Sequence, residues 1–448
     1  MDWIEIFFNS NQKPGQQLGS VLLLGTFGLL MFGPLAFGAV EPWSIFFVEA
    51  GAAALLVAWS VQQVLQGQIQ VRPNPLFPPM LAFGALIVMQ LLLRRSAYMH
   101  ETVNGAMLYV AYGILCFLAS QTMVRKEHVR VMAVVFSVYG TAIACFALLQ
   151  GIASNGRLYW LREPSNGGWI YGPYVNHNHY AGLMEMLVPI PLVISLSKLA
   201  DERKRATSAA AAAIMAGTIF LSGSRGGMVA LLVELFVLAV LLTTQKKGIR
   251  TAIAVGVFSL VVVAVLVWVG GAELGHRLAT MSSASHSDIT GDMRIALNRD
   301  GFRMFLRKPV LGWGLGTFPI AYPQFRSFYT NFFVNEAHDD YVQLLVEMGL
   351  LGFLTMIWYL ASALRSSVGK LANWTSDING AVAVACLLGI SGILVHSLVD
   401  FNLQIPANAA LFYVLCTLAA SEKLIQPARR RKPVKPTEEH PLPASEVV

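Results

Sequence analysis

Long apolar runs constrain this chain more than any other feature of its sequence. Of its 448 residues, 55% are hydrophobic and only 13% are charged. Inside a bilayer every backbone N–H and C=O group has to be bonded within the protein, so such runs cross the membrane as helices when they are about 17 to 25 residues long. We therefore predict an all-α, polytopic integral membrane protein, and the composition excludes a soluble enzyme.

The apolar runs predict about twelve transmembrane helices, with ten to thirteen allowed. They lie near residues 18–40, 44–65, 76–93, 105–122, 131–152, 178–199, 207–222, 226–243, 250–270, 341–364, 380–399 and 406–424. The seventh and eighth runs are short, so a single re-entrant hairpin is an alternative for this pair.

The distribution of Lys and Arg predicts the orientation. With both termini in the cytoplasm, the inner segments carry most of the 32 basic residues, and most of the others lie in a loop long enough to cross the membrane whatever its charge. This predicts a cytoplasmic N-terminus over 1–17 and a transmembrane domain over 18–424, with a large periplasmic loop at 271–340 that contains short helices. Residues 425–448 are expected to form a disordered basic cytoplasmic tail that touches membrane lipids.

Arg225 lies within Ser222-Gly223-Ser224-Arg225-Gly226-Gly227, between the seventh and eighth predicted spans. Serines and glycines favour a tight turn into a helix N-terminus, whose free N–H groups suit an anion. A guanidinium at that place makes a diphosphate-binding site. The alternative is an arginine that extends to the lipid headgroups.

A helix is predicted from Asp292 to Lys308. On its projection Arg294 lies on the apolar face, where a guanidinium is costly unless it is paired with an anion. Arg294 is therefore a candidate ligand for a substrate anion, although Asp400 or Glu336 would satisfy it equally well. Three further arginines point away from that face: Arg299, Arg303 and Arg307.

His338 lies where the polar loop meets the tenth predicted span. We predict that Asn335 caps this helix, that His338 falls in its first turn, and that Asp339 and Asp340 support the helix dipole. A neutral imidazole with an ordinary pKa can take a proton from a hydroxyl group. The alternative is a structural histidine at the start of a helix.

Two glycines share the predicted face of His338. On a helical projection Leu345, Gly349 and Gly352 line up with the imidazole. Glycines on one face allow a neighbouring helix to approach closely. We therefore expect His338 to be held in a crevice between helices.

Asn178 and His179 precede the sixth span within Asn176-His177-Asn178-His179. They are expected to cap this span or to contact a sugar. The two histidines together with His338 could instead hold zinc, but the sequence fixes no third ligand. We predict no metal ion.

Other ionisable residues fall inside or beside spans, where such groups are functional candidates by default. His396 and Asp400 lie four residues apart near the end of the eleventh span and are predicted to pair. A purely structural role, in which they brace Arg294, is the alternative. Glu185, inside the sixth span, is expected to pair with an arginine on the outer side.

These residues carry a resemblance to a known family. His338-Asp339 is followed after nine residues by Gly349-Leu350-Leu351-Gly352, a pattern that resembles the signature of the O-antigen ligase and O-antigen polymerase superfamily. Asp339 departs from that pattern, because the ligases more often have Asn, Ser or Gln there. Three further stretches are similar to the family, in the family's order: Asn176 to Gly182, Ser222 to Gly227, and Pro309 to Phe318.

The resemblance implies a metal-independent, inverting glycosyltransferase of the bacterial inner (cytoplasmic) membrane with its active site facing the periplasm. The implied donor is an undecaprenyl-diphosphate-linked glycan, with no cofactor and no nucleic acid. Arg225 and Arg294 would then bind the diphosphate, and His338 would be the base.

The implied acceptor is lipid A core, which makes an O-antigen ligase. A polymerase that extends a lipid-linked repeat, a protein O-oligosaccharyltransferase and a transporter of lipid-linked glycans are the alternatives. Against transport, the polar residues lie at the outer border of the spans and no internal repeat is visible.

Overall fold

The computed structural model describes residues 14–164, 168–244, 291–330 and 333–422, with the isolated positions 253 and 256. The predicted span at 250–270 and the predicted tail at 425–448 lie outside the described residues, apart from those two positions. Throughout the described ranges the regular structure is helical and no strand forms. The predicted all-α class is confirmed.

Most predicted spans correspond to a helix. The helices are α2 (Pro14–Leu35), α3 (Pro42–Leu65), α4 (Phe77–Leu92), α5 (Met99–Thr122), α6 (Lys126–Ile152), α7 (His177–Leu187), α8 (Pro189–Leu196), α9 (Glu202–Leu221), α10 (Arg225–Thr244), α12 (Gly291–Arg307), α13 (Phe318–Ala321), α14 (Asp340–Val368), α15 (Ile378–His396) and α16 (Pro406–Ala420).

Within the described ranges, eight segments are long and apolar enough to cross a membrane, and α4 and α16 are shorter apolar helices. The total of twelve spans stays a prediction. The pair predicted at 207–222 and 226–243 forms two separate helices of 20 residues each, α9 and α10. Of the two, α10 is long and apolar enough to cross a membrane, whereas α9 is not among those segments, so the choice between two spans and a re-entrant hairpin stays a prediction.

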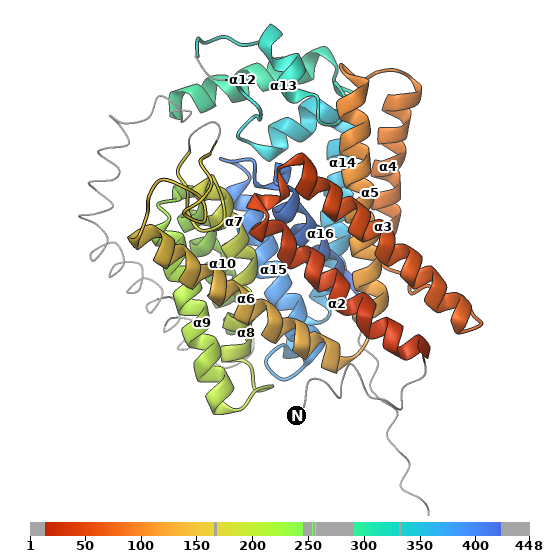
Figure 1. Ribbon diagram of the computed structural model, residues 1–448, viewed down its shortest axis with the longest axis vertical. Helices are drawn as coiled ribbons and strands as arrows, with labels where there is room; N and C mark the ends of the chain where they lie inside the picture. Colours follow the sequence, from red (N-terminus) through yellow and green to blue (C-terminus); the bar gives the residue numbers. More distant parts are fainter. Residues whose placement is uncertain are drawn as a thin grey trace, which may run out of the picture.

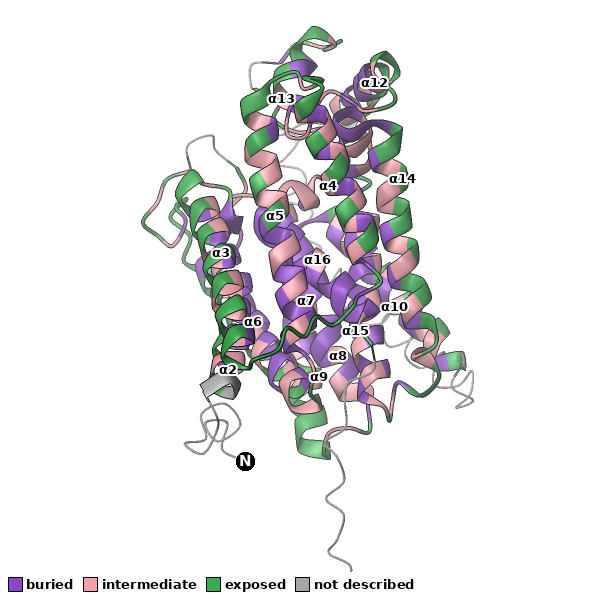
Figure 2. Ribbon diagram, turned by 90° about the vertical axis from the view of Figure 1, so that its right-hand side faces the viewer, coloured by how far each residue is buried: buried purple, intermediate pink, exposed green. Residues whose placement is uncertain are grey.

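The centre of the bundle is formed by α7, α15 and α16, with the other long helices around them (Figures 1 and 2). In the most apolar window of His177–Leu196, 78% of the residues are buried, and in that of Ile378–His396, 61% are buried. In the corresponding window of Pro42–Leu65, at the periphery, only 17% are buried. The helices α12 and α13 lie across one end of the bundle (Figure 1). We call this end the α12 end.

Helix α14 is interrupted at Gly349, whose φ of 63° and ψ of −166° are not helical. A side chain is strongly disfavoured with that backbone, and a β-carbon there would collide with the carbonyl oxygen of Val310. The interruption therefore requires glycine and allows the segment 309–316 to approach the α14 backbone directly.

The segment 309–316 satisfies the backbone groups that the interruption frees. The N–H groups of Trp313 and Gly314 donate to the carbonyls of Val346 and Glu347 at 2.9 and 3.0 Å. On the other side of the break, Leu350 N–H donates to the Pro309 carbonyl at 2.7 Å. Unsatisfied groups would be costly in this apolar setting, so these bonds fix the loop onto α14.

Gln90 of α4 completes this junction. Its side-chain amide donates to the carbonyls of Leu311 and Glu347, at 2.6 and 2.8 Å, and accepts from Leu315 N–H at 3.2 Å. The carboxylate of Glu347 accepts from Gly316 N–H at 2.8 Å. Two buried polar side chains, Gln90 of α4 and Glu347 of α14, thus join the segment 309–316 to the bundle.

The predicted role of Gly349 is wrong, because Gly349 faces the loop at Val310 rather than a neighbouring helix. Gly352 lies against Met348 of its own helix and, as predicted for a neighbouring helix, close to Phe83 of α4, but it does not share a face with His338. The helical projection fails here because the chain is not helical at Gly349, so residues before and after the break do not share one face.

We predict that Gly349→Ala lowers the unfolding temperature of the protein in detergent. The free energy cost should exceed about 1 kcal/mol, because the native backbone is incompatible with a side chain. Gly369→Ala is the matched control, since Gly369 ends the same helix with φ of −64° and has open space around it. Equal unfolding temperatures for the two variants would contradict the role given to Gly349.

Candidate active site at the α12 end

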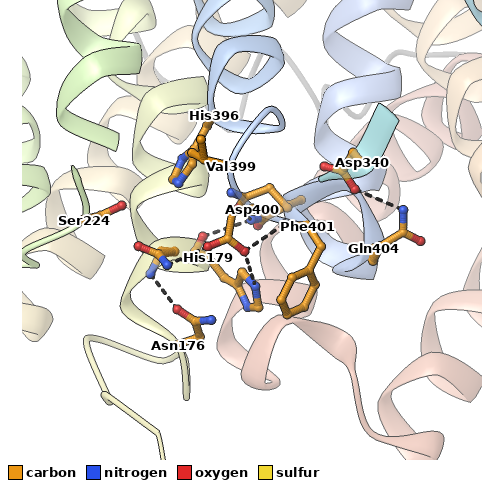
Figure 3. A network of polar contacts seen from close by, with 12 residues as sticks. Asn176, His179, Ser224, Asp340, His396, Val399, Asp400, Phe401 and Gln404 are labelled. Carbon is orange, nitrogen blue, oxygen red and sulfur yellow. Dashed lines mark hydrogen bonds and ion pairs between the residues drawn. The ribbon is translucent and has the colours of Figure 1, made fainter. Parts of the chain in front are cut away.

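The turn after α15 carries Asp400 into the bundle, where its side chain is 1% exposed. One carboxylate oxygen accepts from the side-chain amide of Asn178 at 2.6 Å. The other lies 3.6 Å from Nε2 of His179 and accepts from the N–H of Phe401 at 2.8 Å. Figure 3 shows Asp400 at the centre of this cluster. The turn and the start of α7 are therefore joined through one carboxylate.

Asp400 keeps its charge in this setting. Burial alone would raise the pKa of its carboxyl group, but the contact with His179 and the nearby His338 and His396 outweigh burial and hold that pKa well below its usual range. The site consequently contains a fixed negative charge at neutral pH.

His338 lies beside this carboxylate, with a strained backbone. Its φ of 54° is left-handed, which is uncommon for a residue other than glycine and concentrates at functional sites. The imidazole of His338 meets the ring of Phe401 edge-on, with ring centroids 4.7 Å apart. The imidazole of His179 also lies edge-on to the ring of Phe401, with the same centroid distance of 4.7 Å. Phe401 thus separates the two imidazoles.

His338 is neutral at physiological pH. The ordinary pKa expected from the sequence is wrong, because burial lowers the pKa of His338 to about 4; Asp400 opposes this effect and Arg294 adds to it. Its Nδ1 is buried and has no hydrogen-bond partner among the described residues. A buried nitrogen without a partner inside the protein is available to a ligand.

The predicted start of α14 is wrong. Asn335 does not cap the helix, and His338 is not in its first turn, because its left-handed backbone cannot continue a helix. The helix begins at Asp340, and the cap is Asp339, which accepts from the N–H groups of Tyr341 and Val342 at 3.0 Å each. The helix-start role predicted for Asp339 is confirmed.

Asp340 joins this helix start to the turn after α15. Its carboxylate accepts from the Ser397 hydroxyl at 2.7 Å, from Leu403 N–H at 3.1 Å and from the Gln404 amide at 3.0 Å. The same turn that holds Asp400 is therefore held by the residue two positions after His338 (Figure 3).

Gln343 fixes the segment before His338, and the sequence analysis did not single it out. Its side-chain oxygen accepts from Ala337 N–H at 2.9 Å, and its amide donates to Glu336 and, at 3.4 Å, to Glu347. Burial, with the nearby Glu347, raises the pKa of Glu336 to about 8. Glu336 is therefore a protonated partner of Gln343, not the predicted alternative partner of Arg294.

Arg294 of α12 reaches the same turn. One guanidinium nitrogen donates to the carbonyl of Val399 at 2.6 Å, next to Asp400 in the chain. Its side chain is half-buried, whereas Arg299, Arg303 and Arg307 are exposed, as the helical projection predicts.

Arg225 is the first residue of α10 and its side chain is exposed. Ser224 caps the helix by accepting from Gly227 N–H at 3.1 Å, so the predicted tight turn is confirmed. A β-carbon on Gly226 would lie 2.5 Å from the ring of His396 and 3.0 Å from the Val399 side chain. The start of α10 therefore packs directly on the 396–402 turn, where Gly226, the residue after Arg225, lies against Val399, whose carbonyl Arg294 contacts.

His396 does not pair with Asp400 through its side chain, which corrects the prediction. Its Nδ1 is 2.8 Å from Oε1 of Glu185, and both side chains are buried. Glu185 therefore has a histidine partner instead of the predicted arginine. Glu234 of α10 lies near Glu185, and neither carboxyl oxygen of Glu234 has a hydrogen-bond partner in the described ranges.

The two histidines of the Asn176 to His179 stretch point to different neighbours. His177 stacks on Trp169 with ring centroids 4.4 Å apart, and Trp169 also covers Gly223. His179 faces Phe401 and Asp400. The cap of α7 is Asn176, whose side chain accepts from Asn178 N–H at 2.8 Å, so the capping role predicted for Asn178 and His179 is wrong. Within residues 14–164, 168–244, 291–330 and 333–422, no group of three His, Cys, Asp or Glu side chains could hold a metal ion.

Comparison with known proteins identifies one related family. No curated protein matches the chain. Residues 210–357 match the family described as O-antigen ligase, and this range contains Arg225, Arg294 and His338. The chain thus carries an O-antigen ligase family region, which confirms the resemblance to the O-antigen ligase and polymerase superfamily that its motifs predict.

Proposed function

We propose that this protein is a membrane glycosyltransferase that moves a glycan from undecaprenyl diphosphate to an acceptor hydroxyl. One observation carries the proposal. His338 is neutral, has a buried nitrogen without a partner, and lies near the ionised Asp400, whose turn Arg294 contacts. A base, a fixed negative charge and cations for a leaving group are the parts that this reaction needs.

His338 is the general base in this proposal. The acceptor oxygen attacks the anomeric carbon of the donor sugar, and its proton passes to the free nitrogen of His338. The bond from the anomeric carbon to the phosphate oxygen breaks, and its electron pair leaves with the diphosphate. Asp400 stabilises the imidazolium that forms, because its charge favours protonated His338. Direct displacement inverts the anomeric configuration, and no step requires a metal.

Arg225 and Arg294 bind the diphosphate in this proposal. The charge that develops on the leaving group is stabilised by cations, and the free N–H groups at the start of α10 add to this effect. Asn178 and His179 hold Asp400 in place through their side-chain contacts, which is a more specific role than the sugar contact expected from the sequence.

The acceptor is lipid A core in this proposal, which makes the protein an O-antigen ligase acting on the periplasmic side of the inner membrane with both termini in the cytoplasm. The spacing from His338 to Gly349 and Gly352 supports the ligase over a polymerase, which would extend a second lipid-linked glycan. The acceptor supplied in the assay separates the two.

We predict that His338→Ala lowers transfer by at least about 100-fold, because the reaction loses its base. Protein in nanodiscs receives an undecaprenyl-diphosphate oligosaccharide, with and without lipid A core, and the products are identified by mass. His100→Ala is the control, an exposed histidine at the start of α5. Glycan on lipid A core indicates a ligase and lengthened lipid-linked glycan a polymerase. Full activity of His338→Ala would refute the mechanism.

We predict that Arg294→Ala lowers kcat by roughly 100-fold, the scale of losing one group that stabilises a developing charge. Arg299→Ala removes the same charge from the exposed face of the same helix and should retain nearly full activity. A similar loss in both variants would mean that α12 contributes only general positive charge.

We predict a flat pH dependence of kcat/KM from pH 5 to 8. A base has to be deprotonated, and the pKa of His338 is about 4, so activity should fall only as the pH drops toward that value. Because Asp400 raises this pKa, Asp400→Asn should move the acid limb to still lower pH and lower the plateau. A limb near pH 6.5 in the wild type would show that His338 is not desolvated.

A further inference from the structure

A cavity lies toward the end of the bundle opposite the proposed active site. Its volume is about 550 Å³. Helix α15 runs from Ile378 to His396, and the residues of α15 that line the cavity, including Ala381 and Ala385, come from its first half. The remaining walls come from α2, α6, α8 and α16 and from the end of α5. The cavity is therefore separate from the Asp400 site at the other end of α15.

The cavity walls are mainly apolar, and most of them are buried. Phe27, Phe136, Val193 and Leu415 are each no more than 4% exposed. Protein interiors pack as densely as organic crystals, so a void of this size is unusual. Apolar cavities stay dry and accept apolar molecules. The volume also falls within the range of about 300 to 1,000 Å³ typical of ligand sites.

The polar side of the cavity is basic. Arg130 and Lys204 line it together with Glu127, and the segments 125–130 and 198–205 hold seven Lys and Arg against three Asp and Glu. Lys204 contacts Asp201 at 2.7 Å, but both side chains are largely exposed, so this pair contributes little. The surplus of positive charge beside an apolar cavity matches an amphiphile with an anionic head.

We propose that this cavity binds an anionic phospholipid, with an acyl chain between α2, α6, α8 and α16 and its phosphate at Arg130 and Lys204. The lipid comes from the leaflet opposite the proposed active site. It joins helices from both halves of the chain, and the site is independent of the glycosyl transfer proposed above. The polyprenyl tail of a glycan donor is the competing occupant.

The test uses the full-length protein, stripped of lipid in detergent and then exposed to dioleoyl phosphatidylglycerol or dioleoyl phosphatidylcholine. Native mass spectrometry counts bound lipids and a thermal scan gives the unfolding temperature. We expect one tightly held phosphatidylglycerol, an unfolding temperature raised by several degrees, and no such effect of phosphatidylcholine. Recovery of a polyprenyl lipid from the protein as first purified, or equal effects of both phospholipids, would overturn the proposal.

Two test variants and one control variant locate the lipid. Arg130→Gln with Lys204→Gln should weaken phosphatidylglycerol binding at least tenfold. Arg125→Gln with Arg203→Gln, which changes the same charge outside the cavity, should not. Ala385→Phe places a larger side chain in the cavity and leaves the basic residues unchanged. This variant should bind phosphatidylglycerol more weakly. Equal binding by the two charge variants, or full binding by a folded Ala385→Phe protein, would also overturn the proposal.

Discussion

The need to satisfy backbone polar groups away from water governs this fold. Where α14 breaks at Gly349, the freed groups are bonded by the segment 309–316, and Gln90 completes the junction. Irregular backbone at membrane depth is stable only when it is satisfied in this way. The consequence is a loop layer anchored to the bundle, and with it a fixed position for α12 and its Arg294.

A second set of contacts places the charges of the site. The turn after α15 is held on one side by Asp340 and on the other by Asn178 and His179 of α7. Asp400, in the middle of that turn, is consequently fixed and ionised. The charge of Asp400 raises the pKa of His338, but burial outweighs it and keeps the imidazole neutral, so that His338 can accept a proton at physiological pH.

The buried pair of Glu185 and His396 lies beneath this turn, where α7, α10 and α15 meet. Buried ion pairs gain less than their short distance suggests, because both groups lose their hydration, but losing one partner is costly. Gly226, the residue after Arg225, lies directly against the His396 ring and the Val399 side chain. Because Gly226 has no side chain, α10 can begin against the 396–402 turn.

Local hydropathy, periodicity and capping in the sequence predict the helical membrane class, the positions of most described spans, the α12 helix with its single inward arginine, and the turn before Arg225. Sequence motifs also predict the family resemblance. Three features depend instead on packing between distant parts of the chain: His338 precedes its helix in a left-handed conformation, His396 pairs with Glu185, and Gly349 breaks α14. These features arise from contacts between residues far apart in the chain, and helical periodicity carries no information about such contacts.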